Sequence, residues 1–248
     1  MRDKKHRDAG NLFAVEGGKL VNEAKMSGIN IKQVFFTDSV AVKHGRLISD
    51  MHEAGVQVYN VTDEVYEKIS SEKNPEGIFA VCEKFSTFGS CDKEKVRGPF
   101  VMLENIQDPS NLGTIIRTAC ALGTENILLT DDCADIYNYK TQRAAMGTLY
   151  KVKIFITKNI VADIEYQKTA GNRVFAAALC SDSADISDIE FLPGDSIVIG
   201  NEGSGIKSET LLSCTGNVII PMKRNAESLN AAAAAAIFIW ERQKGMIK

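Results

Sequence analysis

A glycine-rich stretch in the second half of the chain has the composition of a ligand-binding loop. Residues 197–206, IVIGNEGSGI, join an apolar strand to a loop that contains Gly200, Gly203 and Gly205. Glycines let a backbone turn sharply and approach a ligand closely, and ligands of open α/β sheets bind beyond the carboxyl ends of the strands. The order GxxGxG is neither the dinucleotide fingerprint GxGxxG nor a phosphate-binding P-loop. We expect a ligand loop of another kind here, and a plain turn is the alternative.

A second stretch, residues 105–119 (NIQDPSNLGTIIRTA), places polar side chains at the start of a helix. The turn DPSN follows a strand, and the free N–H groups of the helix that it opens favour anions. We expect Asn111 in the helix cap, with Arg117 about 1.7 turns further on and both side chains facing the strand ends. An ordinary cap followed by a surface arginine would explain the same spacing.

A third stretch, residues 219–236 (IIPMKRNAESLNAAAAAA), runs from a strand through a polar turn into an alanine-rich helix. Ser228 is a reasonable N-cap for this helix. No charge follows until Glu241, a pattern that favours burial on all sides, in the core or in an interface. Simple helix propensity is the alternative explanation of the alanines.

The elements that must position these stretches fall into two parts. In the first part we expect helices over 16–27, 42–54 and 63–69 and strands over 31–37, 56–61 and 78–85. The polar stretch 86–99 then predicts a domain boundary. In the second part we expect strands over 99–106, 126–130, 152–156, 173–179, 196–199 and 217–221, and helices over 112–122 and 137–146, near Lys207 and from about 228. Such alternation predicts an α/β fold with a mostly parallel sheet covered by helices on both faces.

Composition limits the class of protein. The 248 residues, 44% hydrophobic and 25% charged, are typical of a soluble globular protein; no apolar run approaches the ~20 residues of a membrane span, and no signal-peptide pattern follows the start. The scattered cysteines, without a CxxC pair, indicate reduced thiols in the cytoplasm and no metal site. These cysteines are Cys82, Cys91, Cys120, Cys133, Cys180 and Cys214.

The net charge of −3 argues against a nucleic-acid-binding protein, although a local positive face is sufficient for binding because charges act over ~8–10 Å. Two candidate patches are present, one near the start and one near the end of the chain. They consist of Arg2, Lys4, Lys5 and Arg7, and of Lys223 and Arg224. Each could equally be a solvated run of surface charge.

Taken together, the three stretches resemble the SpoU (TrmH-type) branch of the SPOUT RNA 2′-O-ribose methyltransferases in order, spacing and residue type over about residues 99–243. The first part more loosely resembles the L30e-like substrate-binding domain of ribosomal RNA methyltransferases, through residues 13–17 (FAVEG) and 74–81 (NPEGIFAV). The resemblance implies an L30e-like domain over 1–88, a linker over 89–98 and a methyltransferase domain over 99–248 with a trefoil knot at its C-terminal end. It also implies a homodimer whose active site lies at the subunit interface.

The resemblance also assigns residues. S-adenosylmethionine would bind near Leu179, Gly200, Ile220, Met222 and Leu229, with the loop of Asn201, Glu202 and Gly203 lining the site. The polar active-site positions of the family match Asn111, Arg117, Glu202, Ser228 and Asn230. Two departures from the family pattern, Glu104 and the proline-free stretch 150–153, are not expected to touch the site.

The implied reaction moves a methyl group from S-adenosylmethionine to a ribose 2′-hydroxyl, and it requires no metal because the sulfonium is already electrophilic. In the family the arginine that matches Arg117 is described as the general base. A guanidinium stays protonated in proteins, so clamping of a neighbouring phosphate by Arg117 is the physical alternative. Ribosomal RNA of the large subunit is the expected substrate; transfer RNA and a non-catalytic RNA-binding protein remain alternatives, whereas the glycine order argues against a dehydrogenase. The target nucleotide stays open, as does a housekeeping or an antibiotic-resistance role.

Overall fold

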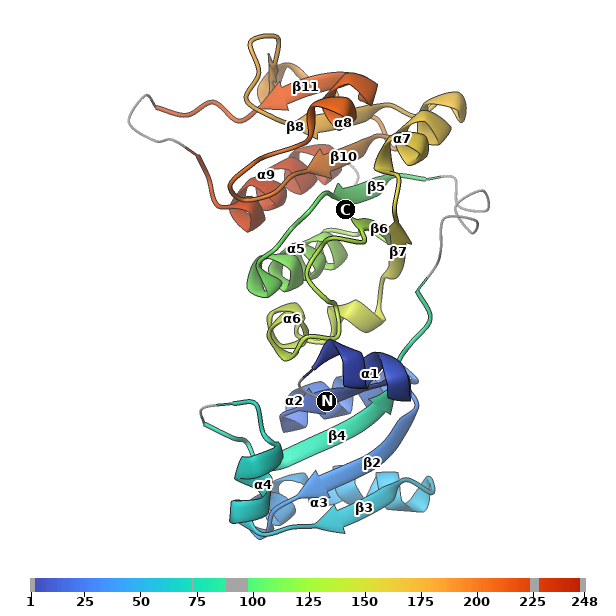
Figure 1. Cartoon of the computed structure of the whole chain (residues 1–248), viewed down its shortest axis with the longest axis vertical. Helices are drawn as coiled ribbons and strands as arrows, with labels where there is room; N and C mark the ends of the chain where they lie inside the picture. The colour runs from blue at the N-terminus through green and yellow to red at the C-terminus, as the bar shows by residue number, and fades with distance from the viewer. Residues whose placement is uncertain (1–2, 73, 88–97, 224–227, 246–248) are drawn as a thin grey trace.

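The computed structural model describes residues 3–72, 74–87, 98–223 and 228–245 and shows two α/β units stacked along the long axis of the molecule (Figure 1). The first unit contains a four-stranded sheet of order β1-β4-β2-β3. Its elements are α1 (Lys4–Gly10), β1 (Leu12–Glu16), α2 (Gly18–Met26), β2 (Ile31–Phe36), α3 (Asp38–Glu53), β3 (Gln57–Asn60), α4 (Asp63–Ile69) and β4 (Ile78–Glu83).

Side chains alternate between the two faces of this first sheet, as the period of two in a strand requires. Phe13 and Val15 of β1 lie in the core under α2 and α3. Ala14 faces the other side, where Phe79 and Val81 of β4 pack near α4. The first sheet is therefore covered by helices on both faces.

The second unit is built on a seven-stranded sheet of order β7-β6-β5-β10-β8-β11-β9, in which every neighbouring pair is parallel. Its strands are β5 (Phe100–Leu103), β6 (Asn126–Thr130), β7 (Lys153–Thr157), β8 (Val174–Ala177), β9 (Ala184–Asp185), β10 (Ser196–Ile199) and β11 (Gly216–Ile219). All residues of β5, β6 and β10 are buried, as expected for strands covered on both faces. The predicted mostly parallel α/β sheet is confirmed.

Helices cover both faces of this second sheet. They are α5 (Pro109–Ala121), α6 (Tyr139–Ala145), α7 (Ile160–Thr169), α8 (Ser208–Ser213) and α9 (Ala231–Gln243). One buried cluster joins α5 and α9 to the sheet, and a second joins α7 and α8 to its other face. Gly113 allows α5 to pack close to α6, because a Cβ atom at this position would lie 2.4 Å from the Thr141 carbonyl oxygen.

An aromatic cluster joins the two units. The rings of Phe13 and Phe85 pack against Tyr137, each with centroids 5.1 Å apart, and Tyr150 lies 5.8 Å from Phe85. The Tyr137 hydroxyl donates a hydrogen bond of 2.7 Å to the Phe85 carbonyl oxygen. Arg7, 4% exposed, forms an ion pair with Asp135 across the same junction. Arg7 is thus used inside the protein, so the basic patch expected at the start of the chain is smaller than its sequence indicates.

Some expectations about the helices and strands need correction or extension. The helices α1 and α7 and the strands β1 and β9 do not appear among the predicted elements, and α3 begins at Asp38 rather than at 42. The helix α9 is buried along one face only, so the expectation of burial on all sides is wrong for the single chain: Ile237 and Trp240 are 37% and 49% exposed. No helix in the described ranges has the length and apolar character needed to span a membrane.

Candidate functional site

Three loops that are distant in sequence meet beyond the carboxyl ends of the strands of the second sheet. The Asn111 amide donates a hydrogen bond of 2.9 Å to the Glu202 carboxylate and accepts one of 3.0 Å from the Asn230 amide. Backbone N–H groups of Gln107 and Asp108 also point at this carboxylate, each at 3.3 Å. The three stretches singled out in the sequence are therefore joined through a row of three polar side chains.

Helix caps fix two members of this row. The Asp108 side chain caps α5 by accepting hydrogen bonds from the N–H groups of Ser110 and Asn111. Asn111 thus lies in the first turn of the helix, and its expected position in the cap is wrong. Asn230, not Ser228, caps α9, because its side-chain oxygen accepts from the N–H groups at 232 and 233. The same amide bonds to Asn111 through its nitrogen, so one residue both starts the helix and completes the row.

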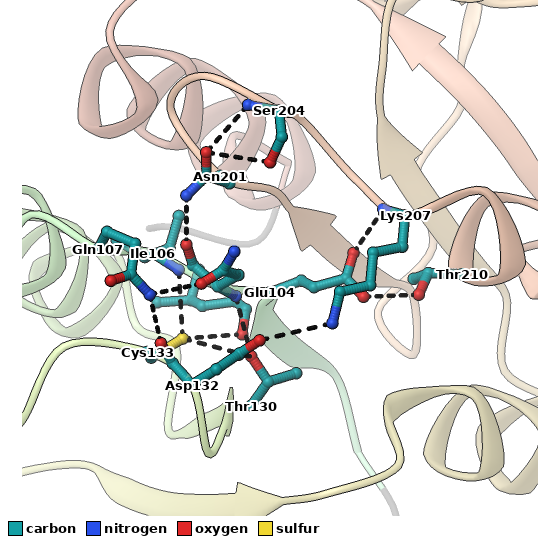
Figure 2. A network of polar contacts seen from close by, with 12 residues as sticks. Glu104, Ile106, Gln107, Thr130, Asp132, Cys133, Asn201, Ser204, Lys207 and Thr210 are labelled. Atoms are coloured by element: carbon teal, nitrogen blue, oxygen red, sulfur yellow. Dashed lines mark hydrogen bonds and ion pairs between the residues drawn. The ribbon is translucent and has the colours of Figure 1, made fainter.

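The glycine-rich loop is shaped by Asn201 (Figure 2). Its backbone pairs with Gly205 through two hydrogen bonds of 3.0 Å, and its side-chain oxygen accepts from the N–H groups of Gly203 and Ser204 at 2.9 Å. Its amide nitrogen donates to the Asn105 carbonyl at 2.7 Å, which ties this loop to the loop after β5. A Cβ atom on Gly200 would lie 2.5 Å from the Gly205 carbonyl, so the closure of the loop requires a glycine there.

The buried side chain of Glu104 binds the segment that follows the same loop (Figure 2). The side chain is 1% exposed and accepts hydrogen bonds from the Lys207 N–H at 2.8 Å and the Thr210 hydroxyl at 2.7 Å. Both donors follow directly on the glycine-rich loop. The side-chain partners of Glu104 are not among the assigned site residues, but Glu104 holds the end of the glycine-rich loop in place.

An apolar pocket of about 130 Å³ opens beside the row, at the carboxyl ends of β8 and β11. Four of the residues assigned to cofactor binding line it, Leu179, Ile220, Met222 and Leu229, together with Ser228. Gly200, Asn201, Glu202 and Gly203 belong to the neighbouring loop after β10, which pairs with β8. The structure thus places the predicted cofactor residues on adjoining strand ends.

Arg117 lies apart from this cluster. It is exposed and lines a cleft of about 770 Å³ between the two units, together with Lys140 and Arg143 of α6. Its guanidinium has no hydrogen-bond or ion-pair partner among the described residues. The expectation that Arg117 and Asn111 face the same strand ends is wrong within one chain, because six residues at 3.6 per turn leave two side chains about 120° apart around a helix.

The cations of this cleft were not singled out in the sequence. Lys140 and Arg143 are three residues apart on a predicted helix and so share one face, a spacing that could have revealed them. Arg143 forms an ion pair with Glu72 of the first unit. Of the two basic patches that were expected, Arg2 and Arg224 lie outside the described residues.

The environment of Glu202 predicts a pH dependence. Burial raises the pKa of its carboxyl group, but the hydrogen bonds from Asn111 and from the N–H groups of Gln107 and Asp108 outweigh burial, and the pKa is lowered overall. The stabilisation of the row is therefore present above the unfolded pKa of about 4.3 and is lost as the pH falls through the folded value. We expect the NMR signal of the Asn111 side-chain amide to stay constant from pH 8 to about 5 and to shift only in stronger acid. Glu202→Gln should abolish this transition, and a midpoint above the ordinary glutamate value would contradict the prediction.

The described residues contain no group of three side chains suited to hold a metal ion. The described thiols are free, and burial raises the pKa of Cys82 and Cys214 to about 12. These two thiols therefore stay protonated near neutral pH and are poor nucleophiles.

Models of two protein families match the chain. The model of the SpoU rRNA methylase family matches residues 98–240, and the model of an MRM3-like substrate-binding domain matches residues 1–80. The chain is 33% identical over 244 residues to the Bacillus subtilis 23S rRNA (guanosine(2553)-2′-O)-methyltransferase RlmP, covering 97% of this chain and 92% of that protein. It is 31% identical over 178 residues to a 23S rRNA (uridine(2479)-2′-O)-methyltransferase of Streptomyces viridochromogenes, covering 68% and 61% of the two chains.

Among solved structures, the AdoMet-bound rRNA methyltransferase of Sinorhizobium meliloti superposes with a TM-score of 0.85 at 29% identity, covering all of this chain and 92% of that one. The family model spans more than half of the chain, and its match contains the row of Asn111, Glu202 and Asn230 and the adjoining pocket. The chain therefore belongs to the SpoU rRNA methylase family.

Proposed function

We propose that the protein transfers a methyl group from S-adenosylmethionine to a ribose 2′-hydroxyl of large-subunit ribosomal RNA, in the cytoplasm. The observation that carries this proposal is the convergence of the three loops on Asn111, Glu202 and Asn230 beside an apolar pocket. The names of the Bacillus subtilis and Streptomyces viridochromogenes relatives support the reaction and the substrate.

The pocket has features that suit the adenine end of S-adenosylmethionine. Its walls carry small or aliphatic side chains, including Ala177 and Ala178, which leave backbone groups accessible to the polar edge of an adenine. At Gly200 the backbone lies close to the backbone of Gly205, which a residue with a Cβ atom would not allow. Leu179, Ile220, Met222 and Leu229 would hold the adenine and ribose, with the loop of Asn201, Glu202 and Gly203 at the reactive end.

The cofactor supplies an electrophilic methyl group; the protein must position the nucleophile. A ribose hydroxyl attacks only when it lies in line with the bond between sulfur and methyl carbon. Asn111 is held from both sides, by Glu202 and by Asn230, so its amide is fixed in the orientation that can direct a ribose. Arg117 would clamp the neighbouring phosphate through its planar guanidinium. Ser228, which lines the pocket, would contact the ribose.

Within one chain Arg117 lines a cleft other than the pocket, which favours supply of this guanidinium by a second subunit. We therefore propose a homodimer in which each active site combines the pocket of one subunit with Arg117 of the other. The exposed face of α9, which carries Ala233, Ile237 and Trp240 at helical spacing, supports contact between subunits. The trefoil knot that the family resemblance implies also stays a proposal.

If α9 lies in the dimer interface, charged side chains on its exposed face should prevent the dimer from forming. Ile237→Glu together with Trp240→Glu would place two carboxylates in an apolar interface, where unpaired charges are costly. We expect this variant to sediment as a monomer in analytical ultracentrifugation and to lose methyl transfer. Leu212→Glu, a matched change at a position of α8 that is 87% exposed, should leave the dimer intact. A dimer formed by the double variant would contradict the prediction.

The experiment that tests the function is a map of ribose methylation in cells with and without the gene. We expect one 2′-O-methyl group to disappear from large-subunit ribosomal RNA and to return when the purified protein and S-adenosylmethionine are added. Loss of a methyl group from transfer RNA alone would overturn the substrate, and an unchanged map would overturn the activity. Calorimetry should show binding of S-adenosylhomocysteine and none of NAD.

A further inference from the structure

A third cavity, of about 450 Å³, lies on the face of the first sheet that carries α4. We call it the sheet hollow. Its floor is formed by Phe35 of β2 and Phe79 of β4, which are direct neighbours in the sheet, and by Ala14 of β1. One wall comes from the second unit, through Tyr137 and Tyr139. The sheet hollow is therefore built jointly by the two units and is separate from the cofactor pocket.

The lining of the sheet hollow combines aromatic rings with ionisable side chains, among them Asp3 and Lys68. Phe35 is half-buried and stacks on Tyr59, with centroids 5.1 Å apart and an angle of 19° between the rings. Tyr139 is 39% exposed. Lys68 is exposed and lies at the rim, whereas His6, also exposed, lies 3.5 Å from the Asp3 carboxylate. Aromatic platforms of this kind bind unstacked nucleobases, and neighbouring cations bind the attached phosphates.

The sheet hollow adjoins the cleft that contains Arg117. Ser71 and Tyr139 line both cavities. The cleft adds Lys140 beside Arg117 and also contains Arg143, which is paired with Glu72. Arg117 and Lys140 therefore supply positive charge on the side of the methyltransferase unit. A single RNA strand whose phosphates follow these cations would bring a base to the aromatic floor.

We propose that the sheet hollow binds an unpaired nucleobase of the substrate RNA, splayed out from the strand that lies in the cleft between the units. This proposal rests on the proposed function for the nature of the substrate. The cavity exceeds the volume of a single base, so the base can enter together with its sugar. Glu16 contributes indirectly, because its carboxylate accepts hydrogen bonds from the Ser70 hydroxyl at 2.5 Å and from the Ser71 N–H at 3.2 Å and so positions the segment shared by both cavities.

The test uses the full-length protein and a mixed-sequence single-stranded RNA oligonucleotide that carries one 2-aminopurine, whose fluorescence is quenched when it stacks on an aromatic ring. We expect quenching on binding, and for Tyr139→Ala a loss of quenching and a Kd about tenfold higher, in the range that loss of one base–aromatic stack produces. Tyr139→Phe, which keeps the ring, should retain both. Ala14→Leu, which fills the floor without removing a contact, should also abolish quenching; its melting temperature shows whether it folds.

Kinetics with ribosomal RNA distinguish a role of the sheet hollow in RNA binding from a role in methyl transfer. Tyr139→Ala should raise KM for RNA more than it lowers kcat, with unchanged affinity for S-adenosylhomocysteine. Wild-type quenching and KM in both Tyr139→Ala and a folded Ala14→Leu would overturn the inference, even with methyl transfer intact. Quenching by a wild-type protein that methylates no RNA would instead overturn the proposed function alone. Displacement of the oligonucleotide by an apolar peptide but not by unlabelled RNA would also overturn the inference, in favour of a protein partner.

Discussion

Arg117→Lys is expected to lower the rate of methyl transfer about 100-fold or more while the Kd for S-adenosylhomocysteine stays unchanged. Lysine keeps the charge but loses the planar pair of donors that fixes a phosphate, and misplacement of a reacting group by about 1 Å costs a factor of this size. Cofactor affinity should survive because Arg117 does not line the cofactor pocket. Single-turnover kinetics and calorimetry measure the two quantities. Turnover like that of the wild type would contradict a positioning role for the guanidinium.

Mixing two inactive variants tests whether Arg117 acts across the dimer. Arg117→Ala removes the guanidinium. Gly200→Val distorts the cofactor loop, because its side chain would meet the backbone of Gly205. If each site uses Arg117 of the opposite subunit, a mixed dimer contains one intact site. Random exchange between equal amounts of the two symmetric dimers should then restore about a quarter of the wild-type activity. No recovery, with mixed dimers demonstrated by mass spectrometry, would show that Arg117 serves the site of its own chain.

The second large effect is expected at Gly200. In Gly200→Ala the added Cβ would lie 2.5 Å from the carbonyl carbon and oxygen of Gly205, so the backbone of the loop must move. We expect the affinity for S-adenosylhomocysteine to fall about 100-fold and the free energy of unfolding to fall by ~1–3 kcal/mol, as for overpacking elsewhere. Calorimetry and urea denaturation measure these changes.

Gly203→Ala provides the matched comparison within the same loop. Its Cβ would meet only the Asn201 side-chain oxygen, at 3.6 Å, an ordinary contact. We expect the affinity of this variant to fall far less than that of Gly200→Ala. Equal losses in the two variants would show that the loop needs glycine for flexibility in general rather than for the close approach at Gly200.

The parts of the fold that could be predicted are those where local pattern and tertiary environment agree. The strands β6 and β10 are short apolar runs, and both lie buried where they were expected. The strand β1 was missed because its five-residue alternation is brief and is followed closely by a helix. The helix α7 was missed because its charged and apolar residues are spread around the helix, and burial of one side becomes visible only when the sheet is present.

The candidate site shows a similar division. The resemblance to the family points to Asn111, Glu202 and Asn230, and the structure brings these three side chains together. The caps could not be assigned from the sequence, because Ser228 and Asn230 are both good capping residues and the contact with Asn111 distinguishes them. The hydrogen bonds of Glu104 reach Lys207 and Thr210, which follow it by 103 and 106 positions in the sequence. No local sequence pattern can predict a contact over so long a separation.

The aromatic junction between the units has a consequence for the choice of target. Phe13, Phe85, Tyr137 and Tyr150 interlock the sheet that would receive the RNA with the sheet that would hold the methyl donor. Such a joint keeps the separation between the two sheets constant, so the enzyme can act as a molecular ruler. The modified nucleotide would then be selected by its spacing along the RNA from the feature that docks first, and a change in this spacing would move the methyl group to another position.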